Sequence, residues 1–122
     1  MKLIKNTLKL AVVTLIFVLN STNASAQMPT SYEIGSITSD HCVSIDTSKP
    51  LAEFYQIDIA ALNFATETDA KKLFGYISNN RLTYIVDFPN HVAYLKVHAD
   101  RTQFPQDVIW WNDYIQGLCS NQ

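Results

Sequence analysis

Two runs of alternating apolar and polar residues, separated by Pro89 and Asn90, restrict the fold of this chain more than any other feature. They occupy residues 82–88 (LTYIVDF) and 91–97 (HVAYLKV). Successive side chains of a strand point to opposite faces, so each run has one predominantly apolar face. Proline and asparagine are typical of the turn between two paired strands. The sequence therefore predicts a β-hairpin with one face to bury.

A strand and a helix are predicted before this hairpin. Residues 53–62 alternate in the same way and bring three residues to one face: Tyr55, Ile57 and Ile59. Thr66 is a favourable N-cap residue for a helix. After it, apolar residues recur at helical spacing: Ala70, Leu73, Phe74 and Ile77. Asn79 and Asn80 can end this helix, because asparagine tolerates the left-handed conformation that follows many helix C-termini.

A second helix is predicted after the hairpin. Pro105 suits its first turn, with Asp107 just behind, and the helix should run to about Leu118. One of its faces carries five residues at helical spacing: Val108, Trp111, Ile115, Leu118 and Cys119. We expect this face to pack on the sheet, with Trp111 in the core. Trp110 and Tyr114 lie on the neighbouring face, where such a pair either flanks the core or forms an exposed contact patch.

The order strand, helix, strand, strand, helix resembles a ferredoxin-like split βαβ motif without its final strand. We therefore expect an α+β domain over residues 51–122, with an antiparallel sheet and two helices on one face. Residues 27–50 are predicted to form an extended N-terminal segment. Within it, residues 41–46 (HCVSID) alternate as a short strand. We expect this strand to fill the open sheet edge beside the strand at 54–60.

The run "RLTYIVDFPNHVAYLKV" after an amphipathic helix is similar to the middle of a heavy-metal-associated domain, where a V-x-V-D strand turns into an apolar partner strand. The similarity covers residues 54–98. That family carries a metal-binding M-x-C-x-x-C in the loop after its first strand. This chain has "ALNFATETDA" there, without cysteine or methionine. The resemblance therefore implies a ferredoxin-like fold that lacks the metal site, and it transfers no functional residue.

The N-terminus has the composition of an export signal. Three lysines precede an apolar run at residues 10–19, and Ala-Ser-Ala at 24–26 supplies the small residues of a signal peptidase site. Residues 1–26 are therefore predicted to be a cleaved signal peptide, with the mature chain beginning at Gln27. Because the apolar run is too short to cross about 30 Å of hydrocarbon as a helix, no stable membrane insertion is expected after cleavage.

The remaining 96 of the 122 residues suffice for one small domain. Three of the nine Lys and Arg residues lie in the predicted leader. Six therefore remain against eleven Asp and Glu, a net charge of −5 with neutral histidines. An acidic chain without a basic run lacks the electrostatic signature of nucleic-acid or anionic-membrane binding. Neither partner is expected.

Cys42 and Cys119 are the only two cysteines. In an exported protein such a pair predicts a disulfide. Redox and metal-binding cysteines usually lie close together, as in C-x-x-C, whereas these two lie near opposite ends of the predicted mature chain. We expect a structural bridge that joins residues 41–46 to the end of the last helix.

The histidines predict no metal site. His91 and His98 are seven residues apart and would point to opposite faces of a regular strand. His98 can share a face with Asp100, and His41 lies beside a carboxylate, Asp40, but neither pair has a third ligand by spacing.

No catalytic residue is predicted either. No serine lies in a strained nucleophile turn, and there is no glycine-rich phosphate loop. Asp58 and Asp87 lie on predicted strands, and pairing of those strands would place the two carboxylates side by side. Such residues are more often the solvent face of a sheet that helices cover on the other side.

These patterns favour a small exported, non-enzymatic binding or accessory module without a cofactor, acting in the periplasm or outside the cell. Its expected contact residues are Trp110 and Tyr114, with Tyr94 on the sheet face away from the helices, toward a protein or a glycan. The open sheet face also suits a homodimer. Two alternatives are a degenerate metal-handling domain of heavy-metal-associated type and a small hydrolase that uses Asp58 or Asp87.

Overall fold

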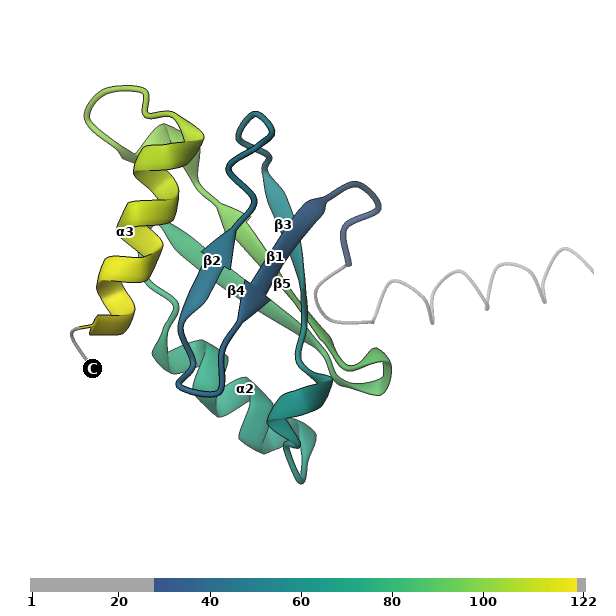
Figure 1. The fold of residues 1–122 in the computed structure, drawn as a ribbon. Coiled ribbons are helices and arrows are strands. Elements are labelled where there is room, and N and C mark those ends of the chain that lie inside the picture. The colour runs from purple at the N-terminus through teal and green to yellow at the C-terminus, as the bar shows by residue number, and fades with distance from the viewer. Residues whose placement is uncertain (1–27, 121–122) are drawn as a thin grey trace, which may run out of the picture.

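The computed structural model describes residues 28–120, so the predicted signal peptide lies outside the described residues. The strands are β1 (Glu33–Ile37), β2 (Val43–Ile45), β3 (Phe54–Asp58), β4 (Leu82–Asp87) and β5 (Val92–Val97), and the α-helices are α2 (Glu67–Tyr76) and α3 (Val108–Ser120) (Figure 1). Three short 3-10 helices lie between them: η1 (Ala60–Leu62), η2 (Phe88–Asn90) and η3 (Ala99–Arg101). Neither α2 nor α3 is long and apolar enough to cross a membrane.

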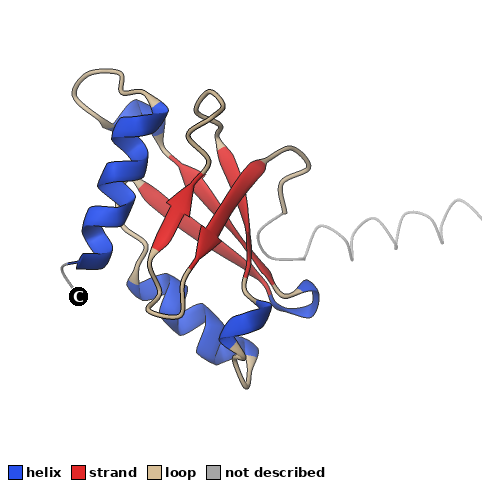
Figure 2. Ribbon diagram, in the orientation of Figure 1, coloured by secondary structure: helices blue, strands red, loops and turns tan. Residues whose placement is uncertain are grey.

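The five strands form one mixed sheet in the order β2-β1-β3-β5-β4 (Figure 2). β1 runs parallel to β3, and every other neighbouring pair is antiparallel. The α+β class and the order of elements from β3 to α3 are as predicted, and the architecture is consistent with a ferredoxin-like kind of fold. The prediction of a purely antiparallel sheet is wrong, because a strand that the sequence did not predict enters beside β3.

The prediction that residues 41–46 pair with β3 is also wrong, since β1 takes that place and β2 pairs with the other side of β1. His41 has a φ of 66°, in the left-handed region, and its amide donates to the carbonyl oxygen of Thr38 at 2.9 Å. Because of this tight turn between the two strands, β2 begins only at Val43. The second strand is consequently only three residues long.

Gly35 allows β1 to lie between its two neighbours. A Cβ atom at this position would lie 3.1 Å from the carbonyl oxygen of Ser44 and 3.3 Å from Cγ1 of Ile57. Both distances are tighter than ordinary van der Waals contact, so a side chain here would displace the backbone or the core. The same glycine interrupts the apolar alternation by which a strand is recognised, which explains why the sequence did not predict β1.

Both helices cover the same face of the sheet, as predicted, and we call it the inner face. α2 packs against β4, and α3 packs against β2. Together they contribute Ala70, Phe74, Trp111 and Ile115 to the core. The strands contribute alternate residues from the inner face: Val43, Ile45, Tyr55, Ile57, Leu82, Val86, Ala93, Leu95 and Val97. The alternation predicted for the hairpin is therefore confirmed.

The two helices begin with side-chain caps. Thr66 accepts a hydrogen bond from the Asp69 amide at 3.1 Å, which confirms the predicted N-cap of α2. The carboxylate of Asp107 accepts one from the Trp110 amide at 2.9 Å, so α3 starts after this residue. Pro105 therefore precedes α3 instead of occupying its first turn.

Asn79 does not end α2 as predicted, because the helix stops at Tyr76 without a left-handed residue. Its side-chain oxygen instead accepts hydrogen bonds from the amides of Arg81 and Leu82, at 2.8 and 3.0 Å. The Asn79 amide donates to the Leu82 carbonyl oxygen at 2.8 Å. These bonds satisfy polar backbone groups of the edge strand β4, which would otherwise be free to pair with another chain.

Two contacts hold α3 against β2, a hydrogen bond and a cysteine pair. The side-chain oxygen of Asn112 accepts a hydrogen bond from the Ile45 amide at 2.9 Å. Cys119, farther along α3, lies at disulfide distance from Cys42, with the Cα atoms 5.1 Å apart, and this confirms the predicted cysteine pair. Seven helical residues rise about 10.5 Å, and three strand residues span about 10 Å. The two spacings match, so an antiparallel helix and strand can form both contacts at once.

Candidate binding surfaces

Three side chains stack at the boundary between α3 and the start of β4, and we call them the aromatic ladder: Trp110, Tyr114 and Arg81. The rings of Trp110 and Tyr114 are nearly parallel, at 5°, with centroids 5.4 Å apart. The guanidinium carbon of Arg81 lies 5.3 Å from the Tyr114 ring centroid, a cation–π contact. The side-chain nitrogen of Asn79 donates to the Tyr114 hydroxyl at 3.2 Å, which holds the Tyr114 ring in place.

Trp110 and Tyr114 are half-buried: both pack against the core, and part of each side chain remains exposed. Trp111 beside them is fully buried, as predicted. Its ring meets those of Trp110 and Tyr114 edge-on, at 5.2 and 5.7 Å between centroids. The inner side of the ladder therefore rests on the core, while its outer side is accessible.

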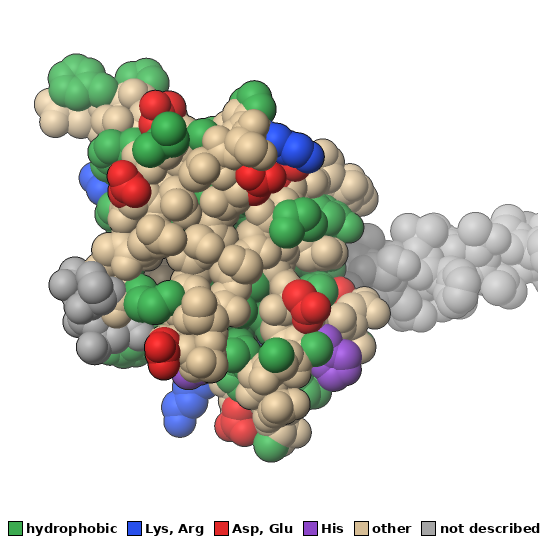
Figure 3. All heavy atoms as spheres, viewed as in Figure 1, with side chains coloured by type: hydrophobic (Ala, Val, Ile, Leu, Met, Phe, Trp, Pro, Cys, Tyr) green, Lys and Arg blue, Asp and Glu red, His purple; other side chains and the backbone are tan. Residues whose placement is uncertain are grey.

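Two exposed apolar side chains lie at or just before the start of α3. Ile109 is 58% exposed, and Phe104, in the loop before the helix, is 64% exposed. Figure 3 shows hydrophobic side chains where this loop projects from the domain. Ile109 precedes Trp110 in the chain, so the start of α3 carries both aromatic and exposed apolar groups, a composition found at many protein contact sites.

Tyr94 lies elsewhere, on the outer face of the sheet, away from the helices. It is only 7% exposed, because Tyr32 packs over it with ring centroids 5.5 Å apart. Its hydroxyl accepts a hydrogen bond from the Gln56 side-chain nitrogen at 3.1 Å. The structure thus brings Trp110 and Tyr114 together and leaves Tyr94 as a covered residue of another surface.

Asp58 and Asp87 are not neighbours. β5 lies between their strands, and both are register partners of Val92. The carboxylate of Asp58 accepts from the amide of Ala60 and that of Asp87 from the side-chain nitrogen of Asn90, each at 2.9 Å. The two carboxylates are therefore not side by side, because the strand order places β5 between their strands.

The three histidines lie at separate turns: His41 between β1 and β2, His91 after η2, and His98 before η3. Within residues 28–120, no three His, Cys, Asp or Glu side chains gather closely enough to hold a metal ion.

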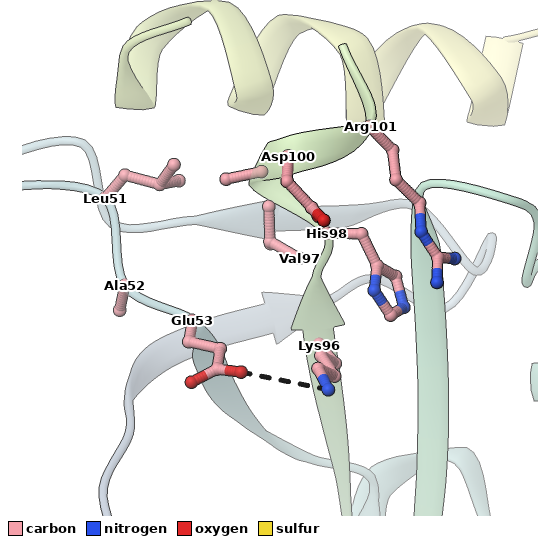
Figure 4. A pocket seen from close by; sticks show the side chains of 9 residues that line it. Leu51, Ala52, Glu53, Lys96, Val97, His98, Asp100 and Arg101 are labelled. Carbon is pink, nitrogen blue, oxygen red and sulfur yellow. Dashed lines mark ion pairs between the residues drawn. The ribbon is translucent and has the colours of Figure 1, made fainter. Parts of the chain in front are cut away.

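An open cleft lies where β5 runs into η3, with a volume of about 530 Å³, and we call it the η3 cleft (Figure 4). Its lining residues are Leu51, Ala52, Glu53, Lys96, Val97, His98, Ala99, Asp100 and Arg101. The ammonium of Lys96 lies 3.8 Å from the Glu53 carboxylate. Nε2 of His98 lies 2.8 Å from the Thr83 hydroxyl, and Figure 4 shows its ring between Lys96 and Arg101.

The surroundings of His98 lower its pKa from the ordinary value. Partial burial is the main cause, followed by the positive charges of Arg101 and Lys96, which outweigh the opposite effects of Asp100 and Glu53. As pH falls, this histidine therefore takes up its proton later in the folded protein than in the unfolded chain. Its contribution to stability is intact above about pH 6.5, the ordinary pKa, and is lost as pH falls from there through the lowered folded value.

We therefore expect the melting temperature of the wild type to fall more steeply than that of His98→Gln between about pH 7 and pH 5. Glutamine can keep a hydrogen bond to Thr83 but does not titrate. His91→Asn is the matched control: the position is exposed, and asparagine tolerates its φ of 57°. Thermal melts across this range measure the difference. Equal pH slopes for the wild type and His98→Gln would contradict the prediction.

Sequence reasoning missed Arg81 and Arg101. Nε of Arg81 donates to the Arg101 carbonyl oxygen at 3.2 Å, and Nη1 of Arg101 donates to the Asn80 carbonyl oxygen at 2.7 Å. Through these two bonds the aromatic ladder adjoins the η3 cleft. The arginines are twenty residues apart, and no local pattern in the sequence indicates that they meet.

Comparisons of the chain with protein-family models, with curated proteins and with solved structures find no match. The class of the protein is therefore defined by its own structure. It is a small α+β domain with a disulfide-linked terminal helix, a mixed five-stranded sheet and an arginine-capped aromatic ladder.

Proposed function

We propose that this protein is a small exported, non-enzymatic binding module that contacts a partner protein through the aromatic ladder and the exposed start of α3. The ladder carries this proposal, because it presents two stacked rings and a guanidinium on a rigid support. Tryptophan, tyrosine and arginine are the side chains enriched at the energetic centres of protein interfaces.

The rigidity of the ladder supports a binding role. Asn79 holds the Tyr114 hydroxyl, and Trp110 rests on the buried Trp111. Side chains that are already ordered lose little conformational entropy on binding, so more of the contact energy contributes to affinity.

A partner protein is favoured over a glycan by the apolar residues around the ladder. Phe104 and Ile109 are exposed and add apolar side chains near the start of α3, where Trp110 also lies. One face of the Trp110 ring is occupied by Tyr114, which leaves less flat aromatic surface for stacking a sugar. The export pattern of residues 1–26 and the cysteine pair support action outside the cytoplasm.

The proposal is tested by placing a photoreactive amino acid at position 109 in the exported protein and identifying the crosslinked partner. The same residue at position 76 is the control, since Tyr76 is exposed on the other helix. Binding of the purified partner is then measured. We expect Trp110→Ala and Ile109→Asp each to weaken it by about tenfold or more, and Tyr76→Ala to leave it unchanged.

Ile109→Asp is the decisive variant, because an exposed side chain can be replaced with little effect on folding. Unchanged affinity in this variant and in a folded Trp110→Ala variant would show that the partner binds elsewhere. Crosslinking from position 109 that is no more specific than from position 76 would also disprove the contact role.

A further inference from the structure

Positive charge is concentrated at the η3 cleft. Only six Lys and Arg residues follow residue 26. Three of them, Arg81, Lys96 and Arg101, lie in or beside this cleft. Two carboxylates, Glu53 and Asp100, also line the cleft, so the cations exceed the carboxylates by one here, whereas the predicted mature chain is acidic overall.

The two arginines keep hydrogen-bond donors available. Among residues 28–120, neither forms a salt bridge with a carboxylate within 4.0 Å, whereas Lys49, Lys71 and Lys96 do. Each arginine donates one hydrogen bond to a main-chain carbonyl oxygen: Arg81 to that of Arg101, and Arg101 to that of Asn80. A guanidinium has five N–H donors in a fixed plane, so these bonds orient the groups without exhausting them.

The cleft combines this charge with an apolar wall. Leu51, Ala52, Val97 and Ala99 line it together with the charged residues. A volume of about 530 Å³ is in the range of small-molecule sites, which are mostly apolar with a few oriented polar groups.

The geometry points to a carboxylate-bearing small molecule as the ligand of the η3 cleft, held by Arg101 and His98 with Arg81 beside them. The local charge selects a monoanion. Lys96 and Arg101 line the cleft with two carboxylates, Glu53 and Asp100, and Arg81 lies beside it. With Arg81 counted, the cations exceed the carboxylates by one, so one negative charge balances the site and a phosphate dianion exceeds it. Arginine also matches the planar carboxylate with paired N–H donors.

The positive surroundings of His98 agree with this assignment. Lys96 and Arg101 both lower the pKa of its imidazole, while Asp100 and Glu53 raise it. A carboxylate in the cleft adds negative charge beside the ring and shifts this pKa upward. Bound ligand is therefore detectable at a single histidine.

The test is a titration of the folded protein with sodium benzoate at constant ionic strength near pH 7, followed by NMR of the arginine Nε–H and histidine ring signals. Benzoate carries one carboxylate and a ring for the apolar wall, and benzamide is its uncharged counterpart. We expect saturable shifts at Arg81, Arg101 and His98 with benzoate and a rise in the His98 pKa. Benzamide should produce neither.

Two variants locate the binding. Arg101→Gln and Lys96→Gln should each weaken benzoate binding by about tenfold or more. Lys72→Gln is the matched control, because it removes the same charge from an exposed position on α2 and should bind like the wild type. Lys96→Gln leaves the hydrogen bond from Arg101 to Asn80 in place, so this variant still tests the binding site if Arg101→Gln perturbs η3.

Equal binding by all three variants would overturn the assignment. Equal shifts with benzamide would show that the carboxylate is irrelevant. If potassium phosphate saturates the cleft at a lower concentration than benzoate does, the cleft is a phosphate site, and the proposal is disproved.

Discussion

Reduction of the Cys42–Cys119 bond should lower the free energy of unfolding by about 4 kcal/mol. The bond closes a loop of 77 residues, which covers most of the described chain. In the unfolded state this loop restricts the chain, and in the folded state the bond secures the end of α3 to the start of β2. For a domain of this size the expected loss is a large part of the total stability, which is about 5–15 kcal/mol for typical domains. Guanidinium unfolding of the oxidised and the reduced protein measures it.

The control for this prediction is the double variant Cys42→Ala/Cys119→Ala. It should unfold at the same denaturant concentration with and without reductant, close to the reduced wild type. Identical midpoints for the oxidised and reduced wild type would contradict a stabilising role for the bond.

Trp111→Ala should destabilise the domain by about 3–5 kcal/mol. Trp111 is fully buried and is among the largest such side chains of the core. Its removal leaves a cavity between α3 and the inner face of the sheet. Its Nε1 atom has no hydrogen-bond partner among the described residues, so the expected loss is that of packing alone. The same denaturation measurement determines the loss.

The adjacent tryptophan is a matched comparison within one helix. Trp110 is half-buried, so Trp110→Ala should cost only about 1–2 kcal/mol. Acrylamide should also quench Trp110 in Trp111→Phe more strongly than it quenches Trp111 in Trp110→Phe. Equal losses for the two alanine variants would contradict the described difference in burial.

Much of the fold could be predicted from residue periodicity. The hairpin of β4 and β5, the cap at Thr66 and the core position of Trp111 all follow from local patterns. β1 could not be recognised, since Gly35 occupies a position where a side chain would collide with its neighbours. Gly35 therefore allows β1 to fit between its neighbours and also prevents the recognition of β1 from the sequence.

The candidate sites were less predictable. Trp110 and Tyr114 were identified from their helical spacing, but their third partner, Arg81, comes from another element. The pairing of Arg81 with Arg101 at the η3 cleft depends on a contact between residues that no spacing rule links. The functional assignment of this cleft therefore requires the folded arrangement.

The sequence by itself determined where most helices and strands form, which of their faces are apolar, and which two cysteines pair, because these depend on short-range periodicity or on there being only two candidates. Only the tertiary structure decided that β1 lies between β2 and β3 and runs parallel to β3, that Asp58 and Asp87 are separated, and that half of the cations after residue 26 gather at one cleft. Those features depend on contacts between residues far apart in the chain, whose closeness is set by packing of the whole domain.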